Sequence, residues 1–289
     1  MKESRGGELY ISDNWIVSNF ESALAGWNDK LSELWSLLTL SPEAFKGGTI
    51  WTLILSIHNA LVGVGYGLLV LFFAIGIFQS ATSFRDFQRP EYVLRHLLRF
   101  ILAKTAVGRC MELMTAIFKV CGGITQTVMS GLGGSISTAA SLPAEIVEAV
   151  EDLGLLESIP LWLVSLLGTL FITVMSFILL LTVYGRFFRL YMYTALAPLP
   201  LASFAGHGTA STGRAFIKSY TGVCMEGAVI VLACLIYSAF LSSSTPAVDS
   251  SLPAVTMVWE YIGQLLFNML ILTGLVRGAN RIVKEMFGL

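Results

Sequence analysis

Four polar residues recur on one face of a predicted helix in an otherwise apolar stretch. Thr105, Arg109, Glu112 and Lys119 lie at offsets of four, seven and fourteen residues from the first. A charged side chain at the bilayer centre costs about 2.5 to 3.5 kcal/mol on insertion scales, so such residues face water, face a bundle interior or pair together. Two arrangements stay open. Either Arg109 and Glu112 neutralise one another while Lys119 reaches the outer interface, or the face lines a lumen.

A third arrangement places this segment on the membrane surface, which would leave an even number of crossings. Two more carboxylates lie near the ends of predicted spans. Glu226 begins the fourth span, and Glu260 is in the first turn of the fifth. Each is either an interface carboxylate with no special task or a polar contact across a subunit boundary. The lumen or subunit-interface candidates are therefore Arg109, Glu112, Lys119, Glu226 and Glu260.

Two prolines mark a different kind of feature. Pro198 and Pro200 interrupt the apolar segment 190–206, and each removes a backbone donor from a helix. We expect a broken helix here, bent or re-entrant, on the cytoplasmic half of the membrane. The whole stretch 190–218 is predicted to be this re-entrant or cytoplasmic segment.

The sequence lacks the motifs of an enzyme or an ATP-driven engine. It contains no His-Glu-x-x-His and no P-loop, and its three histidines are isolated along the chain. No Cys-x-x-Cys pair is present, and all four cysteines fall in hydrophobic segments, so helix packing explains them better than a disulfide or a metal. We therefore expect no enzyme activity, no cofactor and no metal site. Energy for any transport must come from other proteins.

Membrane-spanning helices must position these residues. The chain is 55% hydrophobic and 13% charged, with a mean hydropathy of +0.75, unlike an ordinary soluble domain. Residues 47–84 and 158–185 contain no Lys, Arg, Asp or Glu, and about 20 apolar residues cross a bilayer. The first stretch carries Gly63, Gly65 and Gly67, which let another helix approach closely. This pattern predicts an all-α polytopic protein with spans at 50–79, 97–120, 159–184, 227–241 with flanking residues, and 256–276.

Loop charge predicts the orientation of these five spans. Lys and Arg accumulate in short cytoplasmic loops, and with the N-terminus outside every short inner loop is basic while the short outer loops hold neither residue. A sixth crossing at 190–206 would place a basic C-terminus outside. All six tryptophans also fall on the outer side, as indole rings at one interface would. The sequence therefore favours five crossings, with the N-terminus outside and the C-terminus inside the inner membrane.

Two segments are predicted to lie outside the membrane. Residues 1–48 form an extracytoplasmic segment whose apolar residues, from Ile16 to Leu38, recur at helical spacing. This amphipathic helix lies flat on the membrane or packs on a partner. The first ten residues hold no apolar run, so we expect the first span to direct insertion. The remaining residues, 49–289, form the transmembrane domain, whose outer loop at 122–158 carries an acidic helix.

The sequence around the prolines resembles a known family. Residues 186–193 read Arg-Phe-Phe-Arg-Leu-Tyr-Met-Tyr, 195–200 read Ala-Leu-Ala-Pro-Leu-Pro, and 213–220 read Gly-Arg-Ala-Phe-Ile-Lys-Ser-Tyr. This pattern resembles the TrbL-type polytopic inner-membrane subunit of type IV secretion, or conjugative transfer, systems. The plan of an outer N-terminus, about five crossings and an inner C-terminus is also similar, although the long polar tail of many members is missing here.

The resemblance implies a subunit of the membrane conduit through which DNA with its relaxase, or effector proteins, leaves the cell. It implies a homo-oligomer around the translocation path, in contact with membrane lipids. It also implies other type IV secretion subunits as partners, separate ATPases among them. Two other functions stay open. A small-solute transporter would use the broken segment and intramembrane Arg109 and Glu112, although no internal repeat is found, and a passive assembly scaffold would have no open pore.

Overall fold

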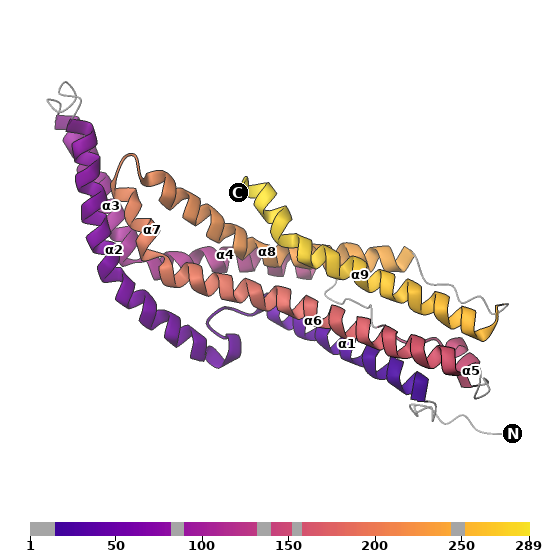
Figure 1. Ribbon diagram of the computed structural model, residues 1–289. Coiled ribbons are helices and arrows are strands. Elements are labelled where there is room, and N and C mark those ends of the chain that lie inside the picture. The colour runs from indigo at the N-terminus through magenta and orange to yellow at the C-terminus, as the bar shows by residue number, and fades with distance from the viewer. Residues whose placement is uncertain (1–14, 82–89, 132–139, 152–157, 244–251) are drawn as a thin grey trace. The chain divides into compact units, whose positions relative to one another are not determined.

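The structure is a computed structural model that describes residues 15–81, 90–131, 140–151, 158–243 and 252–289. Within these ranges the chain forms nine α-helices and two short 3-10 helices, and no strand (Figure 1). The predicted all-α fold is confirmed. The helices are α1 (Trp15–Thr39), η1 (Phe45–Gly48), α2 (Thr49–Ala81), α3 (Pro90–Gly108), α4 (Cys110–Gly131), α5 (Ala144–Glu151), α6 (Ser158–Leu196), α7 (Pro198–Ala202), η2 (Ser203–Ala205), α8 (Ala210–Ser243) and α9 (Ala254–Phe287).

Four of the described helices are long and apolar enough to cross a membrane. Only 17% of the most apolar part of the first is buried within the chain, so lipid or other protein must cover the rest. Large apolar side chains such as Leu53, Phe78 and Phe171 are exposed on these helices. The polytopic membrane protein predicted from composition is confirmed. The spanning segments are Phe45–Gln79, Ile159–Leu196, Ala210–Leu241 and Val255–Phe287.

The helices extend further than the spans that hydropathy predicts. The predicted span at 159–184 stops before Arg186, but α6 continues to Leu196. The span predicted at 227–241 is part of α8, which begins at Ala210, so Glu226 lies within the helix rather than at its start. Backbone hydrogen bonds do not depend on side-chain polarity, and a helix continues through charged residues that find cover elsewhere.

The candidate span at 97–120 is two helices rather than the single helix that the sequence predicts. α3 ends at Gly108 and α4 begins at Cys110. A Cβ on Gly108 would lie 2.7 Å from the hydroxyl oxygen of Tyr66, so α2 approaches α3 closely where the helix is interrupted. Hydrogen bonds from the Arg109 N–H to the Thr105 carbonyl and from the Leu113 N–H to the Arg109 carbonyl continue across the interruption. The fifth crossing stays a prediction.

The described residues divide into two compact units, which take their residues from several helices each. The first unit contains the apolar stripe of α1, which is buried from Ile16 to Leu34 and confirms the predicted amphipathic helix. Asn28 of α1 exchanges two hydrogen bonds of 3.0 Å with the backbone of Ala140. The Tyr261 hydroxyl donates to the carbonyl of Ser141 at 2.8 Å. The first unit draws on residues 1–35, 135–181 and 233–277.

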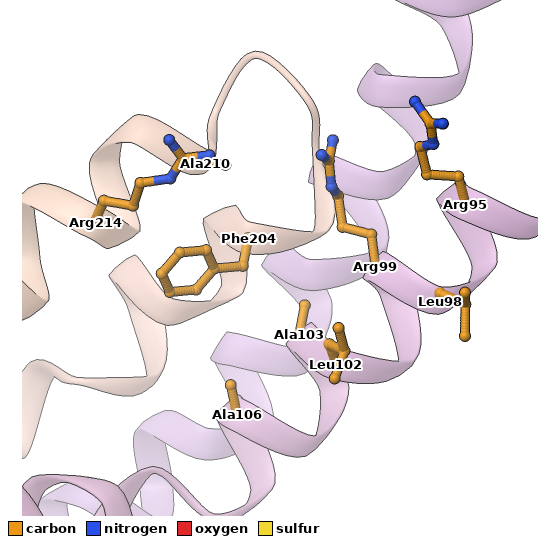
Figure 2. A pocket seen from close by; sticks show the side chains of 9 residues that line it. All are labelled: Arg95, Leu98, Arg99, Leu102, Ala103, Ala106, Phe204, Ala210 and Arg214. Carbon is orange, nitrogen blue, oxygen red and sulfur yellow. The ribbon is translucent and has the colours of Figure 1, made fainter. Parts of the chain in front are cut away.

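The second unit draws on residues 36–134, 182–232 and 278–289. α2, α3 and α7 pack on one another in it (Figure 1), around buried side chains that include Leu69, Val107 and Leu201. The turn before α2 has positive φ angles at Gly47 and Gly48, a conformation that glycine adopts readily. A pocket of about 470 Å³ opens between α3 and the beginning of α8 (Figure 2).

The apolar helix is interrupted just before Pro198, as the sequence predicts. α6 ends at Leu196, and Pro198 opens the short helix α7, where its missing N–H is tolerated. η2 follows, and the Thr209 hydroxyl donates to the Ser203 carbonyl at 2.8 Å just before α8 begins. The kinked segment is therefore a packed part of the second unit. Its position on the cytoplasmic half stays a prediction.

Candidate functional site

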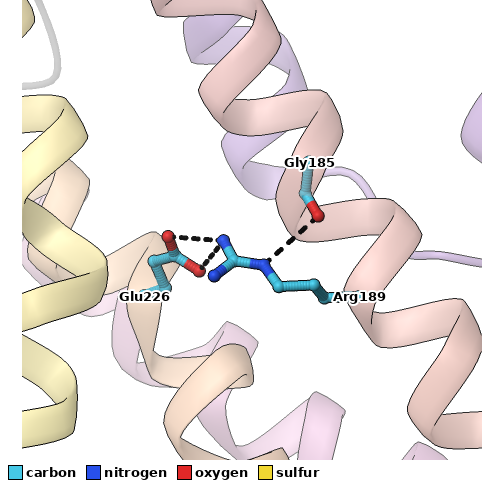
Figure 3. Close-up of polar contacts among 3 residues, drawn as sticks. All are labelled: Gly185, Arg189 and Glu226. Carbon is cyan, nitrogen blue, oxygen red and sulfur yellow. Dashed lines mark hydrogen bonds and ion pairs between the residues drawn. The ribbon is translucent and has the colours of Figure 1, made fainter.

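A partly buried ion pair joins α6 to α8 in the second unit. One Arg189 nitrogen, Nη2, donates to both carboxylate oxygens of Glu226, at 2.8 and 2.7 Å (Figure 3). The Nε of Arg189 donates to the Gly185 carbonyl at 3.3 Å. The Glu226 side chain is 1% exposed and that of Arg189 is 27% exposed. An isolated carboxylate is very costly to bury, so the pair with Arg189 allows Glu226 to lie inside the protein.

Arg186 lies one helical turn before Arg189 and is 2% exposed. Its guanidinium carbon lies 5.2 Å from the centre of the Phe187 ring. Its Nε and Nη2 atoms find no hydrogen-bond partner among the described residues. Two arginines and one carboxylate leave this cluster with an excess of positive charge. Charged groups within spanning segments are uncommon and are functional candidates by default.

Gly227 leaves room for the Arg186 side chain. Gly227 of α8 faces Arg186, and a Cβ there would collide with the Nη1 atom of the guanidinium. Thr125 of α4 is also near, because its hydroxyl oxygen would lie 3.6 Å from the same Cβ. The Thr125 hydroxyl donates to the Cys121 carbonyl at 3.0 Å. α4, α6 and α8 therefore meet at the charged cluster.

His58 belongs to a second buried network in the same unit. Its Nδ1 atom is 2.8 Å from the carbonyl oxygen of Thr194, and its Nε2 atom is 3.0 Å from the sulfur of Cys110. A carbonyl only accepts, so the proton of a neutral ring is on Nδ1 and Nε2 accepts from the thiol. Spacing along the sequence shows His58 as isolated, but in the fold it links α2, α4 and α6. This is a structural role.

The predicted charged face of the 97–120 region is exposed. Arg109, Glu112 and Lys119 all lie on the surface of the described chain. No ion pair within 4.0 Å joins Arg109 to Glu112, two residues that the structure describes, so the predicted neutralisation is not seen. The opposite face of α4 is packed. Its buried residues are Cys110, Met114, Cys121 and Thr125.

The two remaining candidates, Glu226 and Glu260, differ in their exposure. Glu260 is exposed on α9, and its role at a subunit boundary stays a prediction. Glu226 is buried and paired with Arg189, so its interpretation as a carboxylate at a helix end is wrong. Sequence reasoning missed Arg186 and Arg189 because it counted them as residues of an inner loop. Their spacing of three, directly after an apolar run, was the available signal.

The four long apolar helices, two of them joined by the Arg189–Glu226 ion pair, define this chain as a polytopic α-helical membrane protein. The sequence model of the family described as "TrbL/VirB6 plasmid conjugal transfer like protein" matches residues 27–198, more than half of the chain. The chain therefore belongs to the TrbL/VirB6 plasmid conjugal transfer family. It is a multi-pass inner-membrane subunit of a type IV secretion, or conjugation, machine.

The matched range ends at Pro198 and contains Arg186 and Arg189 but not Glu226. The segment 213–220, which contributes to the resemblance in sequence, lies beyond it. The family consists of structural membrane subunits and is not known as an enzyme family. No curated protein and no solved structure matches the chain.

Proposed function

We propose that this chain is a channel or scaffold subunit of the conjugation machine, and that several copies surround the path by which a DNA–protein or protein substrate crosses the membrane. The family match over residues 27–198 carries this proposal. The exposed apolar faces of the spanning helices and the exposed charged face of α4 support it. Both kinds of surface need neighbours that the isolated chain does not supply.

The charged face of α4 is the more specific of these two arguments. Glu112 and Lys119 are exposed on α4, whose other face packs into the second unit, and Arg109 is exposed immediately before α4 begins. In contact with lipid at mid-depth, each would cost about 2.5 to 3.5 kcal/mol. Water in a translocation path, or polar groups of another copy, would remove that cost. We assign this face to the path or to the boundary between copies.

The proposal includes an orientation and partners. Residues 1–48 and the loop 122–158 lie outside the cytoplasm, 190–218 lies on the cytoplasmic side, and the C-terminus is inside. Basic residues on the proposed inner side, such as Arg95, Arg214 and Lys284, support this orientation. Separate ATPases would supply the energy, and the DNA–relaxase complex would be the cargo of a conjugative system.

Deletion of the gene tests the proposed role in transfer. We expect conjugation to be abolished while relaxase nicking of the donor DNA continues, because the protein acts at the membrane and not in DNA processing. Mating frequency and a nicking assay on the same donor cells measure the two steps. Normal transfer without the protein would contradict the proposal, and transfer restored by the wild-type gene on a plasmid is the control.

Thiol labelling tests whether the charged face of α4 meets water. The native cysteines, Cys110 among them, are all buried, so introduced ones report with a low background. We expect E112C and K119C in the assembled machine to react with a water-soluble thiol probe. L163C, on an exposed apolar face, is the matched lipid control and should react slowly because lipid suppresses the thiolate. Protection of both α4 positions from the probe would favour a passive scaffold.

A separate assay tests the transporter alternative. Solute uptake by liposomes that contain this protein alone would favour a transporter.

A further inference from the structure

Three arginines line one end of the pocket between α3 and α8. Arg95 and Arg99 are one turn apart on α3, and Arg214 comes from the beginning of α8. Their guanidinium groups lie on the same side of the pocket (Figure 2). No carboxylate is among the lining residues in the part of the chain that the structure describes. This end of the pocket is therefore strongly basic.

The rest of the pocket is apolar. Leu102 and Ala106 of α3 and Phe204 of η2 form its wall, and Figure 2 places them on the side away from the guanidinium groups. An α-helix rises about 1.5 Å per residue, so Arg99 and Ala106 are separated by about 10 Å along α3. Leu98, which also lines the pocket, is 54% exposed and Leu102 is 69% exposed. The apolar wall thus continues onto an exposed apolar surface.

One further feature strengthens the positive potential of this end, and a second one reflects it. Ala210, the first residue of α8, lines the pocket, and the N-terminus of a helix presents unpaired N–H groups and a partial positive charge. His96 lies beside the arginines on α3. Burial lowers the pKa of His96, and the neighbouring charges of Arg99, His207 and Arg95 lower it further. The neutral imidazole is therefore favoured, first by burial and then by the positive charges around it.

We propose that this pocket binds the phosphate group of an anionic membrane lipid, with an acyl chain lying along the apolar wall. Arg99 and Arg214 donate to the phosphate oxygens, because guanidinium groups bind phosphate in a fixed, often bidentate geometry. Basic pockets between membrane helices on the cytoplasmic side are suited to anionic lipid head groups. Such a lipid would join α3 to the beginning of α8.

The apolar wall favours a lipid over other phosphates. A free phosphate or a nucleic acid strand would occupy only the basic end and would leave Leu102, Ala106 and Phe204 without a partner. An acyl chain buries these side chains, and each buried CH₂ contributes about 0.8 kcal/mol in the general case. Leu98 and Leu102 are exposed as well as lining the pocket, so an acyl chain can continue from the pocket over these side chains.

The test uses the full-length protein, purified in detergent. Thermal unfolding is followed while cardiolipin, phosphatidylglycerol or zwitterionic phosphatidylcholine is added, since a ligand of the folded state raises the Tm with its concentration. We expect the anionic lipids to raise the Tm and phosphatidylcholine to have little effect. In the double variant R99Q/R214Q the apparent Kd for cardiolipin should rise at least about tenfold, because hydrogen bonds to charged groups contribute that much.

Matched variants distinguish lipid binding in the pocket from a general attraction between basic residues and anionic lipids. R277Q/K284Q removes two exposed cations outside the pocket and should bind cardiolipin as the wild type does. R99K/R214K keeps the charge and should lose less affinity than R99Q/R214Q, and a cooperative unfolding transition without lipid shows that each variant folds. An equal loss in R277Q/K284Q would overturn the proposal. If inorganic pyrophosphate raised the Tm as much as the anionic lipids do, the pocket would bind a free phosphate and the proposal would be wrong. It would also be wrong if single-stranded DNA raised the Tm and no lipid did.

Discussion

The ion pair between Arg189 and Glu226 compensates the carboxylate that is buried between α6 and α8. Arg189 is partly exposed and can reach water, whereas Glu226 cannot. Arg186, which is 2% exposed, belongs to the same cluster, and the Glu226 carboxylate partly compensates its charge. Removing one member of such a cluster leaves an uncompensated buried charge, which costs far more than the intact pair contributes.

We predict that R189Q destabilises the protein by about 3 kcal/mol, because it leaves the buried Glu226 carboxylate without its donor. Thermal unfolding in detergent measures the loss. R189Q/E226Q should recover part of the stability, since two neutral amides can pair without an unmatched carboxylate. R281Q is the control, because it breaks an ion pair with Glu285 that is exposed on both sides, and we expect no measurable change. An R189Q variant as stable as R281Q would contradict the assigned role.

This pair also shows what the sequence does not specify at the residue scale. The exposed charges of α4 could be found from their helical spacing, which is a local property. Glu226 and Arg189 are far apart in sequence, and their contact depends on how α6 and α8 cross, which periodicity does not contain. Arg186 could be located only after the end of α6 was known, because hydropathy stops the span at the first charge.

At the scale of elements, one glycine sets the distance between α2 and the broken segment. A Cβ on Gly65 would lie 3.0 Å from both the Cβ and the carbonyl oxygen of Pro198, and 3.2 Å from a methyl carbon of Val107. The neighbouring Gly63 and Gly67 would have nothing within 4 Å of a Cβ. The close helix approach expected from the three glycines is therefore made by Gly65 within this chain.

We predict that G65A lowers the stability by about 1 to 3 kcal/mol, the usual cost of overpacking, because the backbone of Pro198 cannot move aside as a flexible side chain would. G63A and G67A are matched controls on the same helix. They should leave the Tm unchanged or raise it, since alanine favours a helix over glycine by about 1 kcal/mol. Unfolding in detergent measures all three. Equal losses in G63A and G67A would show that general helix crowding, and not contact with α7, is responsible.

The elements themselves were largely predictable, but their ends were not. α2 and α6 could be predicted because a helix that crosses a bilayer needs a long stretch without charged residues. Tyr66 lies close to Gly108 beside the interruption at Arg109, and this tertiary contact is not contained in the hydropathy. Hydropathy treats a span as ending at its first charge, whereas α8 continues through Glu226 because Arg189 compensates it.

At the scale of the whole molecule, the proposed orientation in the membrane rests chiefly on the distribution of Lys and Arg. The positive-inside rule places the basic residues around α3 and the beginning of α8 in the cytoplasm. The same proposal puts α1 and α5 outside, and Glu21 of α1 and Glu148 of α5 are exposed on the described chain. The proposed lipid pocket and the proposed path for the substrate both assume this orientation, so a direct measurement bears on each of them.

We predict that E21C and E148C react with a membrane-impermeant thiol reagent applied to intact spheroplasts, whereas H207C reacts only after the membrane is permeabilised. All three positions are exposed in the described chain, so access to the reagent depends on the side of the membrane and not on burial. The wild-type protein, whose cysteines are buried, gives the background. Labelling of H207C together with E148C in intact spheroplasts would place the broken segment outside, because the reagent does not cross the membrane. The basic pocket would then face the outer leaflet, and the number of crossings between α5 and α8 would be even.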